Sequence, residues 1–254
     1  MTSTTIAHGE PLLQVRNLDK SFGGMKAVDD VTLDLRAGIV TTLVGPNGAG
    51  KTTLFNLITG NLARDSGEVE WLGQDIAGGK PHLIARRGIM RTYQDLRLFD
   101  SMSVWDNIMS ATEYGLLPMP MSSAARHRRK ERIEEVLERT GLSDKRDTRA
   151  LDLAYAERKF LSMARIMATE ARLWLLDEPA SGLDPNSYER FLKILRDDRE
   201  AGTTICIIEH NLDIVIGISD RIAFLDRGRL LADAEPDTVL NDPELAKIYF
   251  GDQS

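Results

Sequence analysis

The chain has only one cysteine among its 254 residues, Cys206, which lies in the apolar run TTICII. A single thiol cannot form a disulfide within the chain, so a disulfide framework is excluded and a reducing cytosol is the expected environment. Cys206 itself is expected to be an ordinary core residue.

Long apolar runs are also lacking. No stretch approaches the roughly 18 apolar residues that a membrane-spanning helix requires, so we expect that the chain itself does not cross a bilayer. The first residues, MTSTTIAHGE, lack the apolar core of a secretory signal. A net charge of −7 argues against a broad nucleic-acid-binding surface, and no nucleic-acid partner is expected.

Positive charge is concentrated locally in the segment RHRRKER at 126–132. It leads into a segment in which Ile133, Val136 and Leu137 recur along one face of a helix. The basic side chains are therefore predicted to lie on the solvated face of that helix. Contact with anionic lipid or with a loop of a partner protein is the alternative.

The segment GPNGAGKTT at 45–53 has the spacing of a phosphate cradle and follows the apolar run 39–44. Backbone N–H groups between Gly45 and Gly50 can converge on phosphate oxygens, Lys51 can reach the outer phosphates, and the Thr52 hydroxyl can ligate Mg²⁺. The next segment predicts a helix that presents its N-terminus to the anion and ends at Gly60. The residues expected to bind nucleotide are Gly45, Pro46, Asn47, Gly48, Ala49, Gly50, Lys51, Thr52 and Thr53. A glycine-rich turn with a solvated lysine is the alternative.

The remaining patterns predict an α/β chain. The segments LLQVRNLDKSF and VTLDLRAG predict antiparallel strands near the start. The apolar runs before Asp177 and His210 are typical of buried parallel strands that carry polar groups at their carboxyl ends. Residues 95–165 combine helical patterns with a Met-rich turn segment, GLLPMPMSS at 115–123, and predict an inserted helical subdomain. A short C-terminal helix is expected to be capped by Asp242, with Pro243 in its first position and Gly251 at its end.

Two adjacent carboxylates follow one of these strands, and an imidazole follows the other. Asp177 is expected to serve Mg²⁺, and Glu178 to orient the water that attacks the γ-phosphate. In isolation such a pair would be read as a helix cap. His210 is expected at the same edge of the sheet, because the carboxyl ends of parallel strands meet there.

Taken together, these residues resemble the ATP-binding subunit of an ABC transporter, over a range from about Leu12 to Gly251. The resemblance implies a P-loop, RecA-like core with an antiparallel β edge, formed by residues 1–94 and 166–254, and a helical subdomain at 95–165. It also implies that Phe22 stacks on adenine, that Gln94 forms the loop that joins the core to the helical insert and helps to bind the metal, and that His210 is the switch histidine. The implied D-loop consists of Ser181, Gly182, Leu183 and Asp184, and the implied signature segment of Leu153, Ala154, Tyr155, Ala156 and Glu157.

Finer features are similar to the importer ATPases for branched-chain amino acids: SFGGMKAV, RTYQDLRLF, GISDRIAFLDRG and the ending NDPELAKIYFG. In such importers two ATPase subunits lie at the cytoplasmic face of the membrane under two permease subunits, and an external protein delivers the solute. This sequence does not identify the solute, because other subunits select it. Urea, amides and other small polar solutes are alternatives to amino acids, and export is an alternative to import.

The signature segment departs from the pattern of this group, which reads LAYGQ, because this chain has LAYAE. Ala156 replaces a glycine where backbone approaches phosphate, so its methyl group is expected to hold the phosphate off or to restrict φ. In this family the signature closes on the partner subunit's ATP. The hypothesis is a pair of unlike subunits with one slow composite site, and the alternative is that a small backbone shift accommodates the methyl group.

Other classes of protein are also compatible with an ATP site. A soluble ABC-type regulator commonly carries two ATPase units in one chain, whereas only one is found in this sequence. A DNA-repair ATPase needs a long coiled-coil insertion, which is lacking. A subunit that binds ATP with little hydrolysis of its own is the third alternative.

Overall fold

The computed structural model describes residues 7–114 and 122–250. The predicted Met-rich turn falls largely outside these residues, and the helix end predicted at Gly251 falls wholly outside them. The strands are β1 (Pro11–Phe22), β2 (Met25–Arg36), β3 (Val40–Val44), β4 (Ser66–Trp71), β5 (Gln74–Asp75), β6 (Ile89–Arg91), β7 (Leu173–Asp177), β8 (Thr204–Ile208), β9 (Arg221–Asp226) and β10 (Arg229–Ala234). The helices are α1 (Lys51–Ile58), α2 (Pro81–Arg86), α3 (Val104–Tyr114), α4 (Ser123–Thr140), η1 (Ser143–Lys145), η2 (Ala150–Asp152), α5 (Tyr155–Met167), α6 (Pro185–Glu200), α7 (Leu212–Ile218), α8 (Pro236–Leu240) and α9 (Pro243–Phe250).

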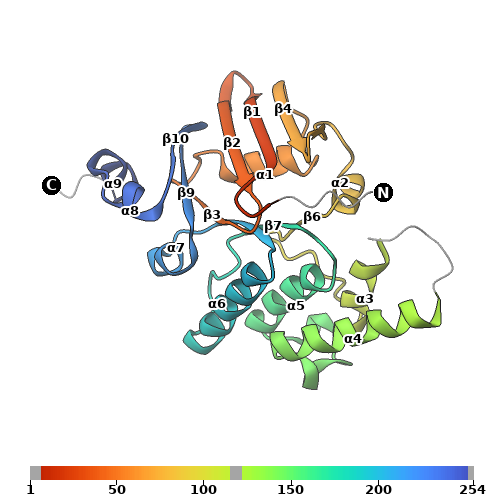
Figure 1. Ribbon diagram of the computed structural model, residues 1–254. Coiled ribbons are helices and arrows are strands. Elements are labelled where there is room, and N and C mark those ends of the chain that lie inside the picture. Colours follow the sequence, from red (N-terminus) through yellow and green to blue (C-terminus); the bar gives the residue numbers. More distant parts are fainter. Residues whose placement is uncertain (1–6, 115–121, 251–254) are drawn as a thin grey trace.

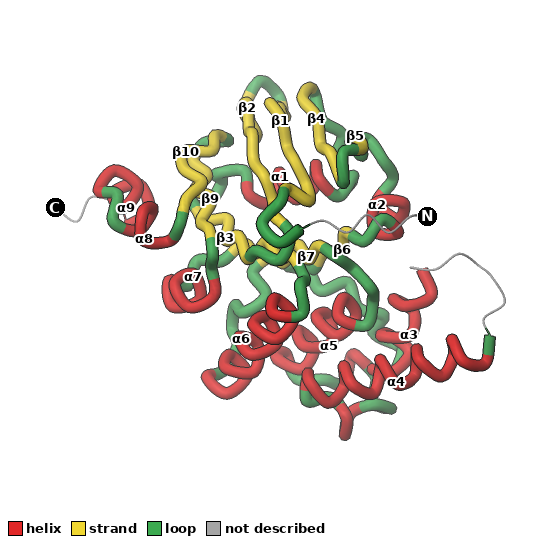
Figure 2. Tube along the Cα trace, viewed as in Figure 1, coloured by secondary structure: helices red, strands yellow, loops and turns green. Residues whose placement is uncertain are grey.

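A central sheet of six strands has the order β10-β9-β3-β8-β7-β6. Its neighbouring strands are parallel except at the edge, where β10 pairs antiparallel with β9. Both faces of this sheet are covered, which explains why its inner strands are continuous apolar runs. In β7, for example, Trp174 and Leu176 pack against helices on one face, while Leu173 and Leu175 pack on the other. Figure 2 shows this sheet crossing the middle of the molecule.

A second sheet has the order β2-β1-β4-β5 and is antiparallel throughout. It stands above the central sheet in Figure 1. Helix α1 connects the two layers, because its buried Leu54 and Phe55 share one core with β1 and β2 on one side and with β7 and β8 on the other. The predicted α/β fold with a P-loop core and an antiparallel β edge is confirmed.

Helices α3 to α7 contribute buried side chains to the core on the opposite face of the central sheet. In Figure 1, α4, α5 and α6 lie below that sheet. Helix α5 extends to Met167, beyond the predicted end of the helical subdomain at residue 165. The subdomain boundaries remain a prediction.

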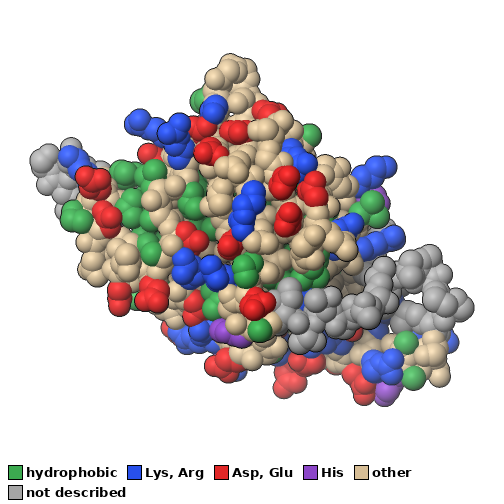
Figure 3. Space-filling view, turned by 45° about the horizontal axis from the view of Figure 1, so that its top comes forward, with side chains coloured by type: hydrophobic (Ala, Val, Ile, Leu, Met, Phe, Trp, Pro, Cys, Tyr) green, Lys and Arg blue, Asp and Glu red, His purple; other side chains and the backbone are tan. Residues whose placement is uncertain are grey.

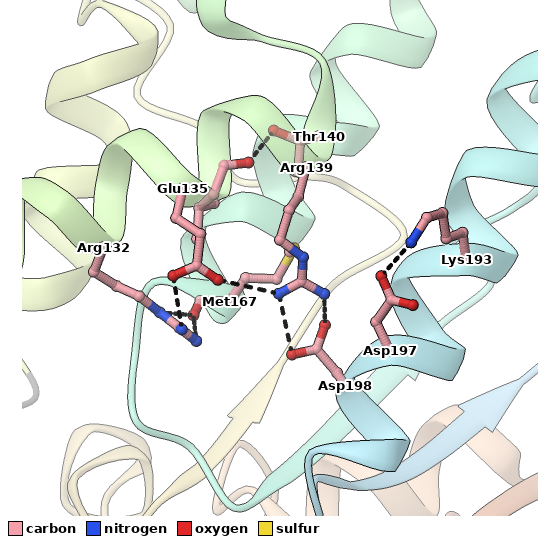
Figure 4. A network of polar contacts seen from close by, with 9 residues as sticks. Arg132, Glu135, Arg139, Thr140, Met167, Lys193, Asp197 and Asp198 are labelled. Carbon is pink, nitrogen blue, oxygen red and sulfur yellow. Dashed lines mark hydrogen bonds and ion pairs between the residues drawn. The ribbon is translucent and has the colours of Figure 1, made fainter.

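Helix α4 is amphipathic, as its sequence predicts. Ile133, Val136 and Leu137 are fully buried, whereas most side chains of 126–132 are exposed. Polar contacts join α4 to its neighbours (Figure 4): the Arg139 guanidinium pairs with Asp198 of α6, and Arg132 donates from Nη2 to the carbonyl oxygen of Met167 at 2.9 Å. The predicted amphipathic helix with an exposed basic face is confirmed, and whether solvent, lipid or a partner meets that face stays a prediction.

The C-terminal helix begins as predicted. The Oδ1 atom of Asp242 accepts hydrogen bonds from the backbone N–H groups of Glu244 at 2.9 Å and Leu245 at 3.2 Å, and Pro243 is the first helical residue. Leu245 packs with Val44 and Phe224 in a small cluster beside β9. The core position predicted for Cys206 is also confirmed, because its side chain is buried.

The surface carries charges of both signs. On the face shown in Figure 3, Lys and Arg are interspersed with Asp and Glu. Within residues 7–114 and 122–250, no helix combines the length and the apolar character that a membrane span requires.

Candidate active site

The phosphate loop follows β3 and runs directly into α1. Gly45, Gly48 and Gly50 have φ values of 142°, 82° and 103°, a region that favours glycine. Neighbouring backbone also crowds two of them: a Cβ on Gly45 would lie 1.9 Å from the carbonyl oxygen of Leu225, and one on Gly50 would lie 2.2 Å from that of Ala27. The bracketing glycines are therefore required by close packing of β9 and β2 against the loop.

Lys51 is the first residue of α1 and its side chain turns back into the loop. Its Nζ donates to the carbonyl oxygens of Gly45 at 2.7 Å and Pro46 at 2.9 Å. Burial lowers the pKa of Lys51, while the negative charges of Glu178 and Asp177 oppose that shift. The ammonium group is thus held inside the loop by two backbone carbonyl groups. Thr52, in the first turn of α1, is exposed.

Asp177 is the last residue of β7 and is almost fully buried. Its Oδ2 forms an ion pair with Nη2 of Arg91 at 2.9 Å, and both side chains are only 3% exposed. Arg91 ends the neighbouring strand β6 and also donates to Oδ1 of Asn56 on α1 at 2.7 Å. A buried carboxylate of this kind needs such a partner, because an unpaired buried charge is strongly unfavourable.

Glu178 follows Asp177 and brings three of the predicted site residues together. Its Oε1 lies 3.1 Å from Nε2 of His210, and its Oε2 accepts a long hydrogen bond of 3.4 Å from the Gln94 amide. The Glu178 backbone has a φ of 48°, which is unusual for a residue other than glycine. Two of these side chains remain accessible, with 38% of His210 and 26% of Glu178 exposed.

Two further charged residues, Glu209 and Lys159, lie behind this group. Glu209 precedes His210 and accepts hydrogen bonds from the backbone N–H groups of Ala180 at 3.0 Å and His210 at 3.3 Å. Lys159 of α5 donates from Nζ to the carbonyl oxygen of Glu178 at 3.0 Å. Burial raises the pKa of Glu209 and lowers that of Lys159, and the opposite charges of the two residues counter both shifts.

Sequence reasoning missed Arg91, Lys159 and Glu209. A signal exists for each of them. Arg91 stands three positions before Gln94, Glu209 directly precedes His210, and Lys159 follows Tyr155 by one helical turn. None of these positions indicates a role in the site until the fold brings the ends of β6, β7 and β8 together with α5.

The signature segment leads into α5. Leu153 is buried, Ala154 precedes the helix, and Glu157 accepts a hydrogen bond from the backbone N–H of Ala154 at 2.8 Å. Ala156 lies in the first turn of α5, and its φ is not positive. The expected restriction of φ is therefore not found, because a helical backbone suits alanine.

The predicted D-loop lies next to the signature segment. Asp184 accepts hydrogen bonds from the backbone N–H groups of Asn186 and Ser187, both at 3.1 Å, and so caps α6. A Cβ on Gly182 would lie 3.1 Å from Cε1 of Tyr155. The ring of the signature tyrosine thus packs against the turn that follows Glu178.

Phe22 ends β1 and is 47% exposed, with the Lys20 ammonium 5.6 Å from the centre of its ring. An open pocket of about 400 Å³ lies beside the phosphate loop, and Phe22 is not among the described residues that line it. Its lining residues are Pro46, Asn47, Gly48, Ala49, Asp226, Arg227 and Ile248. The role of Phe22 remains a prediction.

Comparison with known proteins places these features in one family. Residues 28–181 match the family model described as ABC transporter. The chain is 37% identical to the high-affinity branched-chain amino acid transport ATP-binding protein LivG of Salmonella typhimurium, over 96% of this chain and 99% of that protein. It is 33% identical to the lipopolysaccharide export system ATP-binding protein LptB of Haemophilus influenzae, over 95% of this chain and 98% of that protein.

A solved structure agrees with these sequence matches. The ADP conformation of MJ1267, an ATP-binding cassette of an ABC transporter, superposes with a TM-score of 0.82 at 31% identity and covers 95% of this chain and 99% of that one. The family model spans more than half of the chain, and the relatives are matched over nearly their full length. The chain therefore belongs to the ABC transporter family.

Proposed function

We propose that this chain is the ATP-binding and ATP-hydrolysing subunit of a membrane importer for branched-chain amino acids or a similar small polar solute. The observation that carries the hydrolytic role is the placement of the Glu178 carboxylate between His210 and Gln94, directly after Asp177. The near full-length similarity to LivG supports the transport role and the solute class.

ATP is bound, in this proposal, by the loop of residues 45–53. The backbone N–H groups of the loop and of the first turn of α1 bind phosphate oxygens, because a helix N-terminus attracts anions. Lys51 exchanges its contacts with the carbonyl oxygens of Gly45 and Pro46 for the outer phosphates. Phe22 stacks on the adenine.

The metal ligands in this proposal are Thr52, Gln94 and Asp177, which act directly or through water. Their hydroxyl, amide and carboxylate oxygens are donors that Mg²⁺ prefers. Arg91 contacts Oδ2 of Asp177, and the carboxylate would supply an oxygen to the ion. When bound, Mg²⁺ neutralises charge on the β- and γ-phosphates.

Hydrolysis depends on the Glu178 carboxylate. It orients the attacking water and accepts its proton, as a base within hydrogen-bond reach can do. His210 holds one carboxylate oxygen and Gln94 approaches the other, so the direction of the carboxylate is set by two separate loops.

Transport requires further subunits in this proposal. Residues 153–157 close on the ATP of a second ABC subunit, which we propose is a different chain. The pair of ABC subunits lies at the cytoplasmic face of the membrane and contacts two permease subunits that span it. An external solute-binding protein acts on the permeases. The alternative of a soluble nucleotide clamp is not favoured, because nearly the whole chain matches transport proteins.

The test of the hydrolytic role is Glu178→Gln. We expect the ATPase rate to fall at least about 100-fold, while the Kd for ATP changes less than about threefold, because the amide keeps the size of the side chain but cannot accept a proton. The matched control is Glu200→Gln at the exposed end of α6, which should keep the parent rate. Near-normal hydrolysis by Glu178→Gln would refute the assignment.

The test of the transport role is isolation of the tagged chain from membranes of its native host. We expect one further ABC subunit and two membrane-spanning subunits to copurify with it. ATP hydrolysis by this complex in liposomes should rise when the solute-binding protein loaded with a branched-chain amino acid is added. A chain that purifies without membrane partners contradicts the transport role.

A further inference from the structure

Glu178 has a backbone conformation that its surroundings must maintain. Its φ of 48° lies in the left-handed region, where a side chain is unfavourable. Its N–H donates to the carbonyl oxygen of Ile208 on β8 at 3.0 Å. Its own carbonyl oxygen accepts a hydrogen bond from Lys159 at 3.0 Å and a longer one from the Ser181 N–H at 3.4 Å.

Of these three partners, Ile208 lies in β8 and Ser181 in the turn after β7, whereas Lys159 lies in a helix. It belongs to α5, is only 7% exposed, and reaches the Glu178 carbonyl across the interface between helix and sheet. The negative charges of Glu209 and Glu178 attract its ammonium group, and the Tyr155 ring lies 5.3 Å from it. A buried ammonium group with these partners has little freedom to move independently of α5.

The same helix begins with the signature residues. Tyr155 lies four positions before Lys159, on the same face of α5, and its ring packs against Gly182 of the D-loop. The signature segment, the D-loop and the backbone of Glu178 are thus in contact within one chain, through Tyr155 and Lys159.

We propose that Lys159 is a positioning residue that fixes the Glu178 backbone and links it to the signature helix α5. The proposal rests on the function proposed above for Glu178. When residues 153–157 engage the ATP of the second subunit, α5 shifts and Lys159 transmits that shift to Glu178. Each subunit then adjusts its own hydrolytic carboxylate to the nucleotide held by its partner.

The first experiment compares Lys159→Met and Lys159→Arg in the assembled transporter. Met removes the donor but keeps the length of the side chain, whereas Arg keeps a donor. We expect kcat for ATP to fall at least tenfold in Lys159→Met with KM and the Kd for ATP within twofold of the parent, and Lys159→Arg to recover most of the rate. The control Lys193→Met, at an exposed site on α6, should leave all three values unchanged.

A double variant decides whether Lys159 acts through Glu178. The rate of Lys159→Met combined with Glu178→Gln should equal that of Glu178→Gln alone, because residues that act as a unit are not additive. A full additional tenfold loss would overturn the inference, as would an unchanged kcat in Lys159→Met or equal losses in kcat and ATP affinity.

Two outcomes are kept separate by this design. If Glu178→Gln alone retains the parent rate, the proposed hydrolytic role fails. If Glu178→Gln is inactive and Lys159→Met is fully active, only the positioning role fails. If Lys159→Met does not fold, Lys159→Gln takes its place, and the same difference between kcat and ATP affinity is required of it.

Discussion

At the scale of single residues, the phosphate loop shows that one glycine can satisfy two requirements. Gly45 and Gly50 combine positive φ values with the close approach of the carbonyl oxygens of Leu225 and Ala27. Gly48 also has a positive φ, but among the described residues, its two chain neighbours aside, no atom lies within 4 Å of the position that its Cβ would take. The three glycines therefore differ in how much a methyl group would disturb the loop.

Alanine at these positions separates the two effects. We expect Gly45→Ala to lower the free energy of unfolding by about 3 kcal/mol, because it adds a backbone clash to the strain of a positive φ. Gly48→Ala, which has the strain alone, should lower it by about 1 kcal/mol. Urea unfolding followed by circular dichroism measures both, and equal losses would contradict the role of the Leu225 contact.

At the scale of elements, the site is assembled by the carboxyl ends of β6, β7 and β8. These strands are parallel neighbours, so Arg91, Asp177 and the pair Glu209 and His210 leave the sheet at one edge. Helix α5 then adds Lys159 from below. The order of strands, and not the order of residues along the chain, decides which side chains meet.

An ion pair joins helix α4 to α6. Asp198 is buried, with its side chain 7% exposed, and Arg139 is its partner (Figure 4). Burial raises the pKa of Asp198, and the positive charge of Arg139 opposes that shift. We expect Arg139→Met to lower the free energy of unfolding by about 2 kcal/mol, because it leaves a buried carboxylate without its partner.

The control for this change is Lys193→Met, which breaks the ion pair with Asp197 on the exposed face of α6. It should change the free energy of unfolding by less than about 0.5 kcal/mol, because exposed pairs contribute little. Thermal and urea unfolding of both variants measure the difference. A loss in Arg139→Met no larger than in the control would show that α4 is held by its apolar face alone.

At the scale of the whole molecule, the proposed function assigns to the chain parts of two composite ATP sites. In the proposed function, the phosphate loop, Glu178 and His210 serve the chain's own nucleotide, and residues 153–157 serve that of the proposed partner. Ala156 is helical and has no positive φ, so its methyl group does not strain α5. In the proposed assembly, any catalytic effect of that methyl group acts on the partner's phosphate.

The change Ala156→Gly tests whether the two sites are unequal. We expect the ATPase rate of the assembled transporter to rise by about threefold, which corresponds to about 0.6 kcal/mol in the activation free energy. Ala124→Gly on the exposed face of α4 is the matched control and should not change the rate. An unchanged rate in Ala156→Gly would mean that a small backbone shift accommodates the methyl group.

The sequence predicted much of this molecule because the relevant signals are local. The strand, loop and helix around residues 45–53, the buried strand before Asp177 and the cap at Asp242 each depend on neighbours in the chain. The edge shared by Glu178 and His210 followed from one general property of parallel sheets. The α/β class and the antiparallel β edge could be predicted because they too depend on local apolar patterns in the chain.

Tertiary structure alone decided which charges are buried together. Arg91 and Asp177 are 86 positions apart, and Lys159 and Glu178 are 19 apart on different elements, so no local pattern pairs them. Their contacts exist because β6 lies beside β7 and because α5 packs under the sheet. The sequence by itself determined the phosphate loop and indicated the carboxylate that we propose for hydrolysis. The fold determined how that carboxylate is held, because buried charges must find their partners across the whole chain.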